Sequence, residues 1–428
     1  MHSMKKNILV FPCGSEIGLE VNRALAYSTH FNLYGASSVD DHGKFVYKNY
    51  ISKQLDMDAP DFIAELNHMI KRYQIDYIIP AHDTAVTTMA ENQSHIKAEV
   101  ITSDTETCRI CRSKGETYKL FEQLIPTPAV YLMTDAMDFP VFLKPDIGQG
   151  TKGTFTVTSK EEVDFYSLKD ETLLAMEYLP GDEYTVDCFT NKEGKLLFAE
   201  GRIRNRISNG ISVNSSQVKN EQFQKLAEII NNTLSFRGVW FFQVKERASG
   251  EMVLMEISPR IAGTMALYRN TGVNFILLSL FDRMGYEVTV LQNDFNIEID
   301  RALFSRFTID IDYDYVYVDF DDTIIVDDCV NTTLIKFLYE ARNDNKKIIL
   351  ITKHLYNVQD KLRRFALSNL LFDEIIQIKK SEKKHEFIKN QNSIFIDDSF
   401  VERKEIAQHL NIPVFGLDAI ESLFCAKA

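Results

Sequence analysis

A lysine followed by a glycine-rich loop is the first feature of the chain that suits phosphate chemistry. In FPVFLKPDIGQGTKG, residues 139–153, Lys144 ends a short apolar strand, and Gly148, Gly150 and Gly153 follow it. Glycines let backbone N–H groups approach an anion closely. Residues 154–159 alternate as a strand rather than a helix, so the loop is predicted to be a hairpin tip. This argues against a dinucleotide-binding fingerprint, and the absence of HRD and DFG sequences argues against a protein kinase. A plain surface hairpin is the alternative.

Closely spaced acidic residues are the second such feature, in YDYVYVDFDDTIIVDD, residues 313–328. A β-run there ends in Asp319, Asp321 and Thr323. Further along the chain come IILIT, which ends in Thr352, a lysine cluster at 379–384, and SIFIDDS, residues 393–399. The Asp-x-Asp-x-Thr sequence at the end of a β-run is the sharpest motif in the chain.

The composition is that of an acidic globular protein. Its 428 residues predict about three domains. Because Lys plus Arg number 48 and Asp plus Glu 61, the net charge of -13 disfavours nucleic-acid and membrane partners. Apolar runs such as Val239–Phe242 are far shorter than the roughly 18 residues of a membrane span. With no evident secretion signal, we expect a cytoplasmic protein whose six cysteines, including the pair Cys108 and Cys111, are reduced.

The elements around the glycine loop are predicted from periodicity. Residues 7–11, 31–36 and 77–80 read as strands, and 16–27 and 61–73 as helices, which implies a parallel sheet with helices on its faces. His82 follows the last of these strands, either as a ligand contact or as a structural residue. A helix begins near Lys114, where that lysine is either functional or simply solvated. Residues 173–187 read as strand, Pro-Gly turn and strand.

Two later segments add charged side chains. A strand within residues 200–215 would place Arg202, Arg204 and Arg206 on one face, which suits phosphate or carboxylate substrates, an exposed sheet face being the alternative. In residues 239–260, two apolar strands around a Ser-Gly turn would bring Gln243 and Glu256 side by side as oxygen ligands for Mg²⁺.

In the order of these motifs, residues from about Lys5 to Asp300 resemble the ATP-grasp superfamily, close to the carbamoyl-phosphate-synthetase-like ligases. The resemblance implies that the protein uses ATP with Mg²⁺, or with Mn²⁺ in its place. It implies nucleotide contacts from two lysines, the phosphate loop, the adenine edge and the ribose carboxylate: Lys114, Lys144, Gly148, Gly150, Gly153, Glu177, Tyr178, Leu179 and Glu183.

The same resemblance implies that Gln243, Glu256 and Ser258 are metal ligands and that Arg260 lies beside the transferred phosphoryl group. Ser258 stands where the family usually has Asn, and its hydroxyl is a shorter and weaker ligand, so a second metal ion is less expected than the first. Members of the family transfer the ATP γ-phosphoryl group to a carboxylate, and a nucleophile such as an amine then captures the acyl phosphate.

The C-terminal segment resembles the haloacid-dehalogenase (HAD) phosphohydrolases, all four motifs of which occur in order. The resemblance implies that Asp319 attacks phosphorus and that Asp321 protonates the leaving oxygen and later activates water. Thr352 and one lysine would hold the phosphate, Lys384 fitting better than Lys383. Mg²⁺ would be bound by Asp397 or Asp398, with Asp319 and Asp321 completing the metal site. The short intervals between the motifs leave no room for a cap domain.

We therefore expect an α/β protein with a pre-ATP-grasp domain (1–105), an ATP-grasp domain (106–305) and a capless Rossmann-like HAD domain (312–428). Its predicted function is that of a bifunctional enzyme. The ligase would join a small-molecule carboxylate to an amine, and the phosphatase would remove a phosphate from the product, with surface-polysaccharide tailoring as one setting. The alternatives are a phosphatase for an unrelated metabolite or a ligase by-product, and one domain that is a degenerate scaffold or nucleotide sensor. A homodimer is compatible with this assignment.

Overall fold

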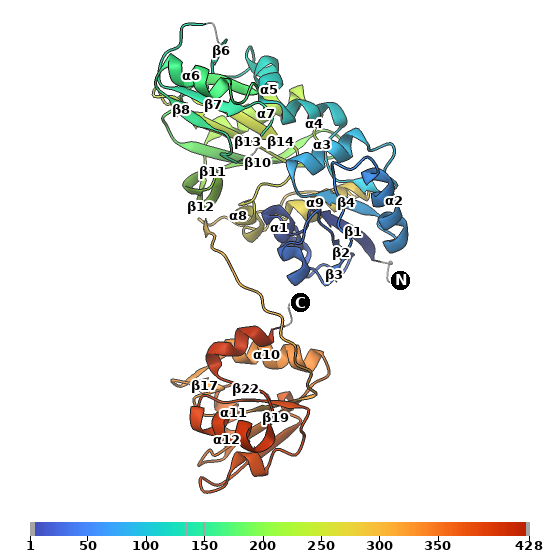
Figure 1. The fold of residues 1–428 in the computed structure, drawn as a ribbon, viewed down its shortest axis with the longest axis vertical. Coiled ribbons are helices and arrows are strands. Elements are labelled where there is room, and N and C mark those ends of the chain that lie inside the picture. Colours follow the sequence, from blue (N-terminus) through green and yellow to red (C-terminus); the bar gives the residue numbers. More distant parts are fainter. Residues whose placement is uncertain (1–4, 133–134, 149, 425–428) are drawn as a thin grey trace. The chain divides into compact units, whose positions relative to one another are not determined.

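The computed structural model describes residues 5–132, 135–148 and 150–424, and it divides into two compact units, Met1–Leu303 and Phe304–Ala428 (Figure 1). Gln149 of the predicted glycine loop and the outermost residues of the first and last predicted domains lie outside the described residues. The predicted boundary at residue 105 falls inside the first unit, and the division into three domains stays a prediction.

The first unit opens with a five-stranded parallel sheet in the order β3-β2-β1-β4-β5. Its strands are Lys6–Phe11 (β1), Phe31–Gly35 (β2), Asn49–Tyr50 (β3), Tyr77–Pro80 (β4) and Glu99–Val100 (β5), and a 3₁₀ turn spans His42–Phe45 (η1). Helix Glu16–Leu25 (α1) packs on one face, whereas Phe62–Tyr73 (α2) and Asp83–Glu91 (α3) pack on the other. The predicted alternation of strands and helices around a parallel sheet is confirmed. Successive side chains of β1 and β4 point to opposite faces of the sheet and so enter different cores.

Two antiparallel sheets follow in the first unit. The four-stranded sheet, in the order β6-β9-β7-β8, contains Val130–Tyr131 (β6), Val141–Pro145 (β7), Phe155–Val157 (β8) and Leu173–Glu177 (β9). The six-stranded sheet, in the order β14-β13-β10-β11-β12-β15, contains Glu183–Thr190 (β10), Leu196–Ser208 (β11), Ile211–Val218 (β12), Gly238–Glu246 (β13), Met252–Ser258 (β14) and Glu298–Asp300 (β15). The predicted hairpin around the glycine loop is confirmed by the β7–β8 pairing. The predicted Pro-Gly turn connects the two sheets.

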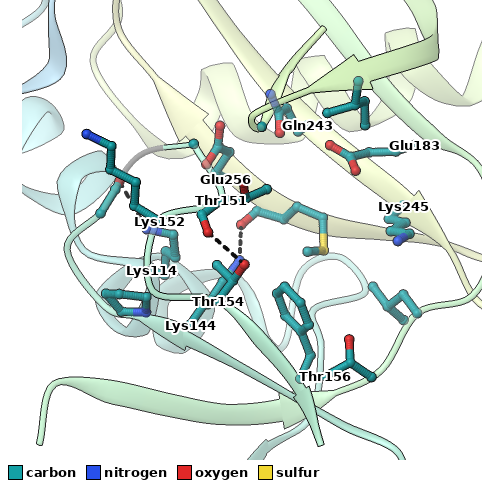
Figure 2. A pocket seen from close by; sticks show the side chains of 18 of the residues that line it. Lys114, Lys144, Thr151, Lys152, Thr154, Thr156, Glu183, Gln243, Lys245 and Glu256 are labelled. Atoms are coloured by element: carbon teal, nitrogen blue, oxygen red, sulfur yellow. Dashed lines mark hydrogen bonds between the residues drawn. The ribbon is translucent and has the colours of Figure 1, made fainter. Parts of the chain in front are cut away.

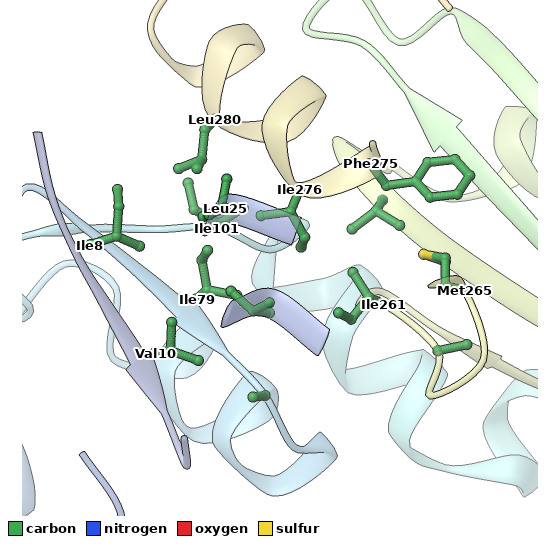
Figure 3. Packing of buried hydrophobic residues seen from close by; sticks show 14 of the residues in the cluster. Ile8, Val10, Leu25, Ile79, Ile101, Ile261, Met265, Phe275, Ile276 and Leu280 are labelled. Atoms are coloured by element: carbon green, nitrogen blue, oxygen red, sulfur yellow. The ribbon is translucent and has the colours of Figure 1, made fainter. Parts of the chain in front are cut away.

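The helices of this region are Thr105–Arg112 (α4), Lys114–Phe121 (α5), Lys160–Ser167 (α6), Glu221–Thr233 (α7), Ala266–Asn270 (α8) and Phe275–Arg283 (α9). Helix α9 extends the core of the parallel sheet (Figure 3). There Ile276 and Leu280 lie in one buried cluster with Ile8 and Ile79, which belong to β1 and β4. The parallel sheet and residues from much later in the sequence therefore share a core, which explains why they form one compact unit.

The second unit is built on a parallel sheet in the order β20-β19-β16-β21-β22. Its strands are Tyr315–Val318 (β16), Lys347–Thr352 (β19), Glu374–Gln377 (β20), Ser393–Ile396 (β21) and Val414–Phe415 (β22), and Ile325–Val326 (β17) pairs with Cys329–Val330 (β18). The helices are Thr332–Asn343 (α10), Val358–Arg364 (α11) and Phe400–Leu410 (α12), with 3₁₀ turns Asn369–Leu371 (η2), Lys384–Glu386 (η3) and Leu417–Leu423 (η4). Helices α10 and α11 cover one face and α12 the other. Only these short elements separate the motifs of this unit, and its assignment as a capless HAD domain stays a prediction.

The three arginines of β11, which the sequence predicts on one strand face, occupy three different environments. Arg202 is 1% exposed and forms two hydrogen bonds to Asp187, at 2.7 and 3.2 Å. Arg206 is exposed and pairs with Asp300 at 2.7 Å, beyond a register shift in β11. Arg204 lines the cavity between the two antiparallel sheets of the first unit. The sequence spacing could not reveal that each guanidinium has a carboxylate of its own.

Breaking the Arg202–Asp187 pair by removing the arginine is predicted to destabilise the first unit. In an Arg202→Met variant, Asp187 would be left fully buried without its cation, which costs about 3–5 kcal/mol for a broken buried pair. Urea unfolding followed by the fluorescence of Trp240, the single tryptophan, measures the free energy of unfolding of this unit. Arg206→Met, on the same strand, is the control and should cost less than about 1 kcal/mol. Equal costs in the two variants would contradict the assignment.

Candidate functional site

A cavity of about 330 Å³ lies between the four-stranded and six-stranded sheets of the first unit (Figure 2). Strand β7, the loop after it and β9 form one side, and strands β10, β11, β13 and β14 form the other. The predicted nucleotide and metal residues that line it are Lys114, Lys144, Gly148, Gly150, Glu177, Tyr178, Leu179, Glu183, Gln243 and Glu256. Residues far apart in the sequence are thus brought together around one cavity of the size typical of small-molecule sites.

Two lysine ammonium groups project into this cavity from buried positions. The Nζ of Lys144 lies 3.4 Å from the carbonyl oxygen of Met255, and the side chain lies over the ring of Tyr118. Lys114 begins α5, and its Nζ donates to the carbonyl oxygens of Asp146 and Gly148 at 3.0 and 3.4 Å. Burial lowers the pKa of Lys144 to about 8, and it also lowers the pKa of Lys114. Both cations are held where water solvates them poorly, so an anionic ligand would be stabilised there.

The glycine loop has the backbone geometry that its sequence predicts. Gly150 and Gly153 have φ values of 63° and 71°, a region that glycine adopts without strain. The loop packs against the β11–β12 turn, where a Cβ on Gly210 would lie 2.4 Å from the backbone nitrogen of Thr151. This close approach ties the loop to the far wall of the cavity.

Gln243 and Glu256 face each other across the β13–β14 ladder, so their predicted adjacency is confirmed. The amide oxygen of Gln243 accepts a long contact of 3.5 Å from Arg204. An amide oxygen beside a carboxylate oxygen is a donor pair that suits Mg²⁺. These two residues are therefore the candidate metal ligands of the cavity.

Ser258 and Arg260 line a neighbouring, smaller cavity, which also includes Glu256, and both are bonded to Asp83 at the start of α3. Arg260 pairs with Asp83 through two hydrogen bonds of 2.7 and 2.6 Å, and the Ser258 hydroxyl donates to the same carboxylate at 2.9 Å. Although burial opposes it, the charge of Arg260 and these hydrogen bonds lower the pKa of Asp83 to about 2. His82 precedes α3 and caps it, accepting from Thr84 N at 3.3 Å.

The segment predicted to form the adenine edge and the ribose contact carries two ion pairs. Arg247 donates two hydrogen bonds, of 2.7 and 2.8 Å, to the carboxylate oxygens of Glu177. These hydrogen bonds lower the pKa of Glu177. Glu183 pairs with Arg204. Because both carboxylate oxygens of Glu177 accept hydrogen bonds from Arg247, this side chain already has a charged partner at the edge of the cavity.

Among the cavity residues that the sequence did not predict are two lysines. Lys245 lies two positions after Gln243 on β13 and lines the same cavity, a relation that strand periodicity alone could have revealed. Lys152 of the glycine loop also lines the cavity. Both add positive charge around the space between the sheets.

The second unit gathers its predicted residues at the carboxyl ends of β16, β19 and β21. The Nζ of Lys384 donates to Asp319 at 2.5 Å and to Asp397 at 2.6 Å, and all three side chains are buried. Burial and the neighbouring Asp397 raise the pKa of Asp319 well above the usual carboxyl range, although Lys384 opposes the rise. Lys383 instead pairs with Glu405 on the surface. The preference for Lys384 over Lys383 is therefore supported by the geometry.

Carboxylate oxygens of Asp319, Asp397 and Asp398 lie within 4.8 Å of one another, which fits a hard divalent cation such as Mg²⁺. The hydroxyl of Thr323 donates to Asp398 at 3.1 Å and accepts from its backbone nitrogen at 3.0 Å. Asp321, predicted as a further ligand, is not in this group. Thr323 therefore orients the Asp398 carboxylate of the candidate metal site.

Asp321 instead contacts a residue that the sequence reasoning missed. Its two carboxylate oxygens lie 2.9 and 2.8 Å from Nδ1 of His354. Thr352 is fully buried, and its hydroxyl accepts from the backbone nitrogen of His354 at 3.1 Å. Nothing in the spacing of His354 from Asp321 signals the contact, because parallel strands bring the two residues together.

Comparisons with known proteins indicate the fold of the first unit. Residues 169–300 match a family described as ATP-grasp in the biosynthetic pathway with Ter operon, whereas no curated protein sequence matches the chain. The biotin carboxylase domain of Hydrogenobacter thermophilus 2-oxoglutarate carboxylase, in complex with MgADP and bicarbonate, superposes with a TM-score of 0.55 at 14% identity, over 68% of this chain and 72% of that one. The chain thus contains an ATP-grasp-like fold.

Two further structures share this fold. The L-amino acid ligase from Bacillus licheniformis superposes with a TM-score of 0.53 at 15% identity. The match covers 65% of this chain and 74% of the ligase chain. The N5-carboxyaminoimidazole synthetase of Staphylococcus aureus, complexed with ADP, has a TM-score of 0.54 at 12% identity, over 68% and 80%. Within the part of the chain that the structure describes, none of the helices has the length and apolar character of a bilayer span.

Lys384 is predicted to hold the carboxylate cluster of the second unit together. In a Lys384→Met variant, Asp319 and Asp397 would face each other without a cation, and losing one partner of a buried ionic group costs about 3–5 kcal/mol. Amide hydrogen exchange of peptides covering β16 and β21 in the full chain measures this loss locally. The neighbouring Lys383→Met removes only a surface pair and should cost less than about 1 kcal/mol. Unchanged exchange in Lys384→Met would refute the role.

Proposed function

We propose that the ATP-grasp-like unit is an ATP-dependent ligase that joins a carboxylate to an amine. The observation that carries this proposal is the pair of buried lysines, Lys114 and Lys144, facing Glu256 across the cavity between the two sheets. Phosphoryl transfer requires positioning and charge neutralisation rather than a covalent nucleophile, and these groups suit that task. The ADP in complexes of the related structures and the amino acid ligase among them point in the same direction.

In the proposed reaction, a carboxylate oxygen of the substrate attacks the γ-phosphorus of ATP, the bond to the β-phosphate oxygen breaks, and an acyl phosphate and ADP result. The amine nitrogen then attacks the acyl carbon, loses a proton and expels inorganic phosphate, which leaves an amide. Lys114, Lys144 and the N–H groups of the glycine loop would bind the phosphates, and Arg260 would face the transferred group. Mg²⁺, held by Gln243 and Glu256, with Ser258 as a weaker ligand, would neutralise phosphate charge.

We further propose that the second unit is a phosphatase of the HAD type. The supporting observation is the arrangement of Asp319, Lys384 and Asp397 at the centre of a parallel sheet, with Asp321 two residues beyond the nucleophile. Lys384 and Thr352 would bind the phosphate of a monoester while Asp319 attacks it. Mg²⁺, held by Asp319, Asp397 and Asp398, would reduce the repulsion between the carboxylate and the phosphate.

The proposed coupling is that the phosphatase removes a phosphate from the ligated product. It rests on the presence of both sets of groups in one chain. A phosphatase that acts on an unrelated metabolite is the second candidate. The polysaccharide setting, the cytoplasmic location and the homodimer stay proposals, while the description of the matched family refers to a biosynthetic pathway with a Ter operon.

Reciprocal variants test the two activities. Lys144→Met should lower substrate-dependent ADP release by at least about a hundredfold, because a preorganised charge at a transferring phosphate typically contributes that much, and should leave hydrolysis of 4-nitrophenyl phosphate unchanged. Asp319→Asn should abolish hydrolysis of 4-nitrophenyl phosphate, because it removes the nucleophile, and should leave substrate-dependent ADP release unchanged. ADP release is measured with pooled carboxylates and amines, and products are weighed by mass spectrometry. If Asp319→Asn does not accumulate a product heavier by one phosphate, the coupling is refuted; if Lys144→Met still releases ADP, the ligase site is refuted.

A further inference from the structure

We propose that His354 is a positioning residue that fixes the carboxyl group of Asp321 for proton transfer in the second unit, an inference that rests on the proposed phosphatase function. The geometry that carries it is the contact of Nδ1 with both oxygens of Asp321, at 2.9 and 2.8 Å. A group that donates and accepts a proton in a transition state has to be held within hydrogen-bond reach of the reacting oxygen.

His354 is itself held firmly. Its ring meets the rings of Phe320 and Tyr356 edge-on, with centroids 5.7 and 6.0 Å away. Its backbone nitrogen donates to Thr352 Oγ1 at 3.1 Å, and its carbonyl oxygen accepts from Nε2 of Gln377 at 2.8 Å. The side chain is only 8% exposed. Such a supporting shell keeps a positioning group in one rotamer.

Asp321, in contrast, depends on His354 for its orientation. Its side chain is 49% exposed, and among the residues that the structure describes its carboxylate accepts hydrogen bonds from His354 alone. Asp319 and Asp397 are fixed by Lys384, and Asp398 is fixed by Thr323. Without the imidazole, the Asp321 side chain would be free to sample several rotamers.

The surroundings of Nε2 specify the tautomer of His354. Nε2 of His354 is buried and has no hydrogen-bond partner within the described part of the chain. A proton on Nε2 would be buried without an acceptor, which is costly. The neutral tautomer with its proton on Nδ1, directed at Asp321, satisfies the one bond that the site offers.

In the first step, an oxygen of Asp319 bonds to phosphorus, the bond to the ester oxygen breaks, and Asp321 gives its proton to that oxygen, which leaves as an alcohol. In the second step, a water oxygen attacks phosphorus, Asp321 takes one of its protons, and the bond to Asp319 breaks to release inorganic phosphate. His354 keeps its own proton in both steps. Its role is to hold the carboxyl group that carries the transferred proton.

The dependence of rate on the leaving group tests this role. His354→Phe keeps the ring contacts and removes the donor, whereas His354→Asn keeps an N–H near the position of Nδ1. For kcat/KM, the Phe variant should lose roughly tenfold to a hundredfold with glycerol 2-phosphate, whose alkoxide needs a proton, because general acids contribute about a hundredfold or more. With 4-nitrophenyl phosphate, a good leaving group, the loss should be less than about threefold. The Asn variant should lose less with glycerol 2-phosphate than the Phe variant does.

Binding of beryllium fluoride with Mg²⁺ is the control for an intact phosphate site and should be the same in the wild type and in His354→Phe. An equal loss with both esters, no loss with either, or an Asn variant as impaired as the Phe variant overturns the positioning role. Failure of the proposed phosphatase function is recognised separately: the wild type would hydrolyse neither ester, or Asp319→Asn would retain hydrolysis. Either outcome refutes the function and the inference with it.

Discussion

The burial of charge is the constraint on which both candidate sites depend. Taking an ammonium group out of water costs several kcal/mol unless a partner of opposite charge is supplied. In the ATP-grasp-like unit, Lys114 and Lys144 are 9% and 6% exposed, and their polar contacts are carbonyl oxygens, with Glu256 as the nearby carboxylate. The lowered pKa values show that these contacts do not offset the cost fully. The cavity is therefore electrostatically suited to a ligand with several negative charges.

The candidate site of the second unit has an excess of buried negative charge, whereas the cavity of the first unit has an excess of positive charge. Lys384 lies between Asp319 and Asp397, which raise its pKa although burial opposes them. One cation therefore serves a cluster that also contains Asp398, and the site has an excess of negative charge. A divalent cation would correct that excess, just as a polyphosphate would correct the excess of positive charge between the sheets. The site of the second unit thus suits a metal ion, and the cavity between the sheets suits a phosphate.

The sequence predicts the elements better than the partners of individual charges. The β7–β8 hairpin, the adjacency of Gln243 and Glu256 and the choice of Lys384 follow from glycine placement, strand periodicity and motif spacing. The burial of Arg202 with Asp187 and the contact of His354 with Asp321 do not, since both depend on how strands pair in three dimensions. Lys245 is an intermediate case, because its face of β13 is predictable although its role is not.

The pH dependence of nucleotide binding tests the central claim, that Lys144 binds phosphate as a buried cation. Since the pKa of Lys144 is about 8 without ligand, MgADP should bind with constant affinity below that pH. Above it, the affinity should weaken up to about tenfold per pH unit, because binding must then take up a proton. Calorimetry between about pH 7 and 9.5 measures this, and Lys144→Arg, which stays charged at that position, should have a flatter profile than the wild type. Wild-type affinity that does not change across this range, or the same decline in Lys144→Arg, would contradict the account.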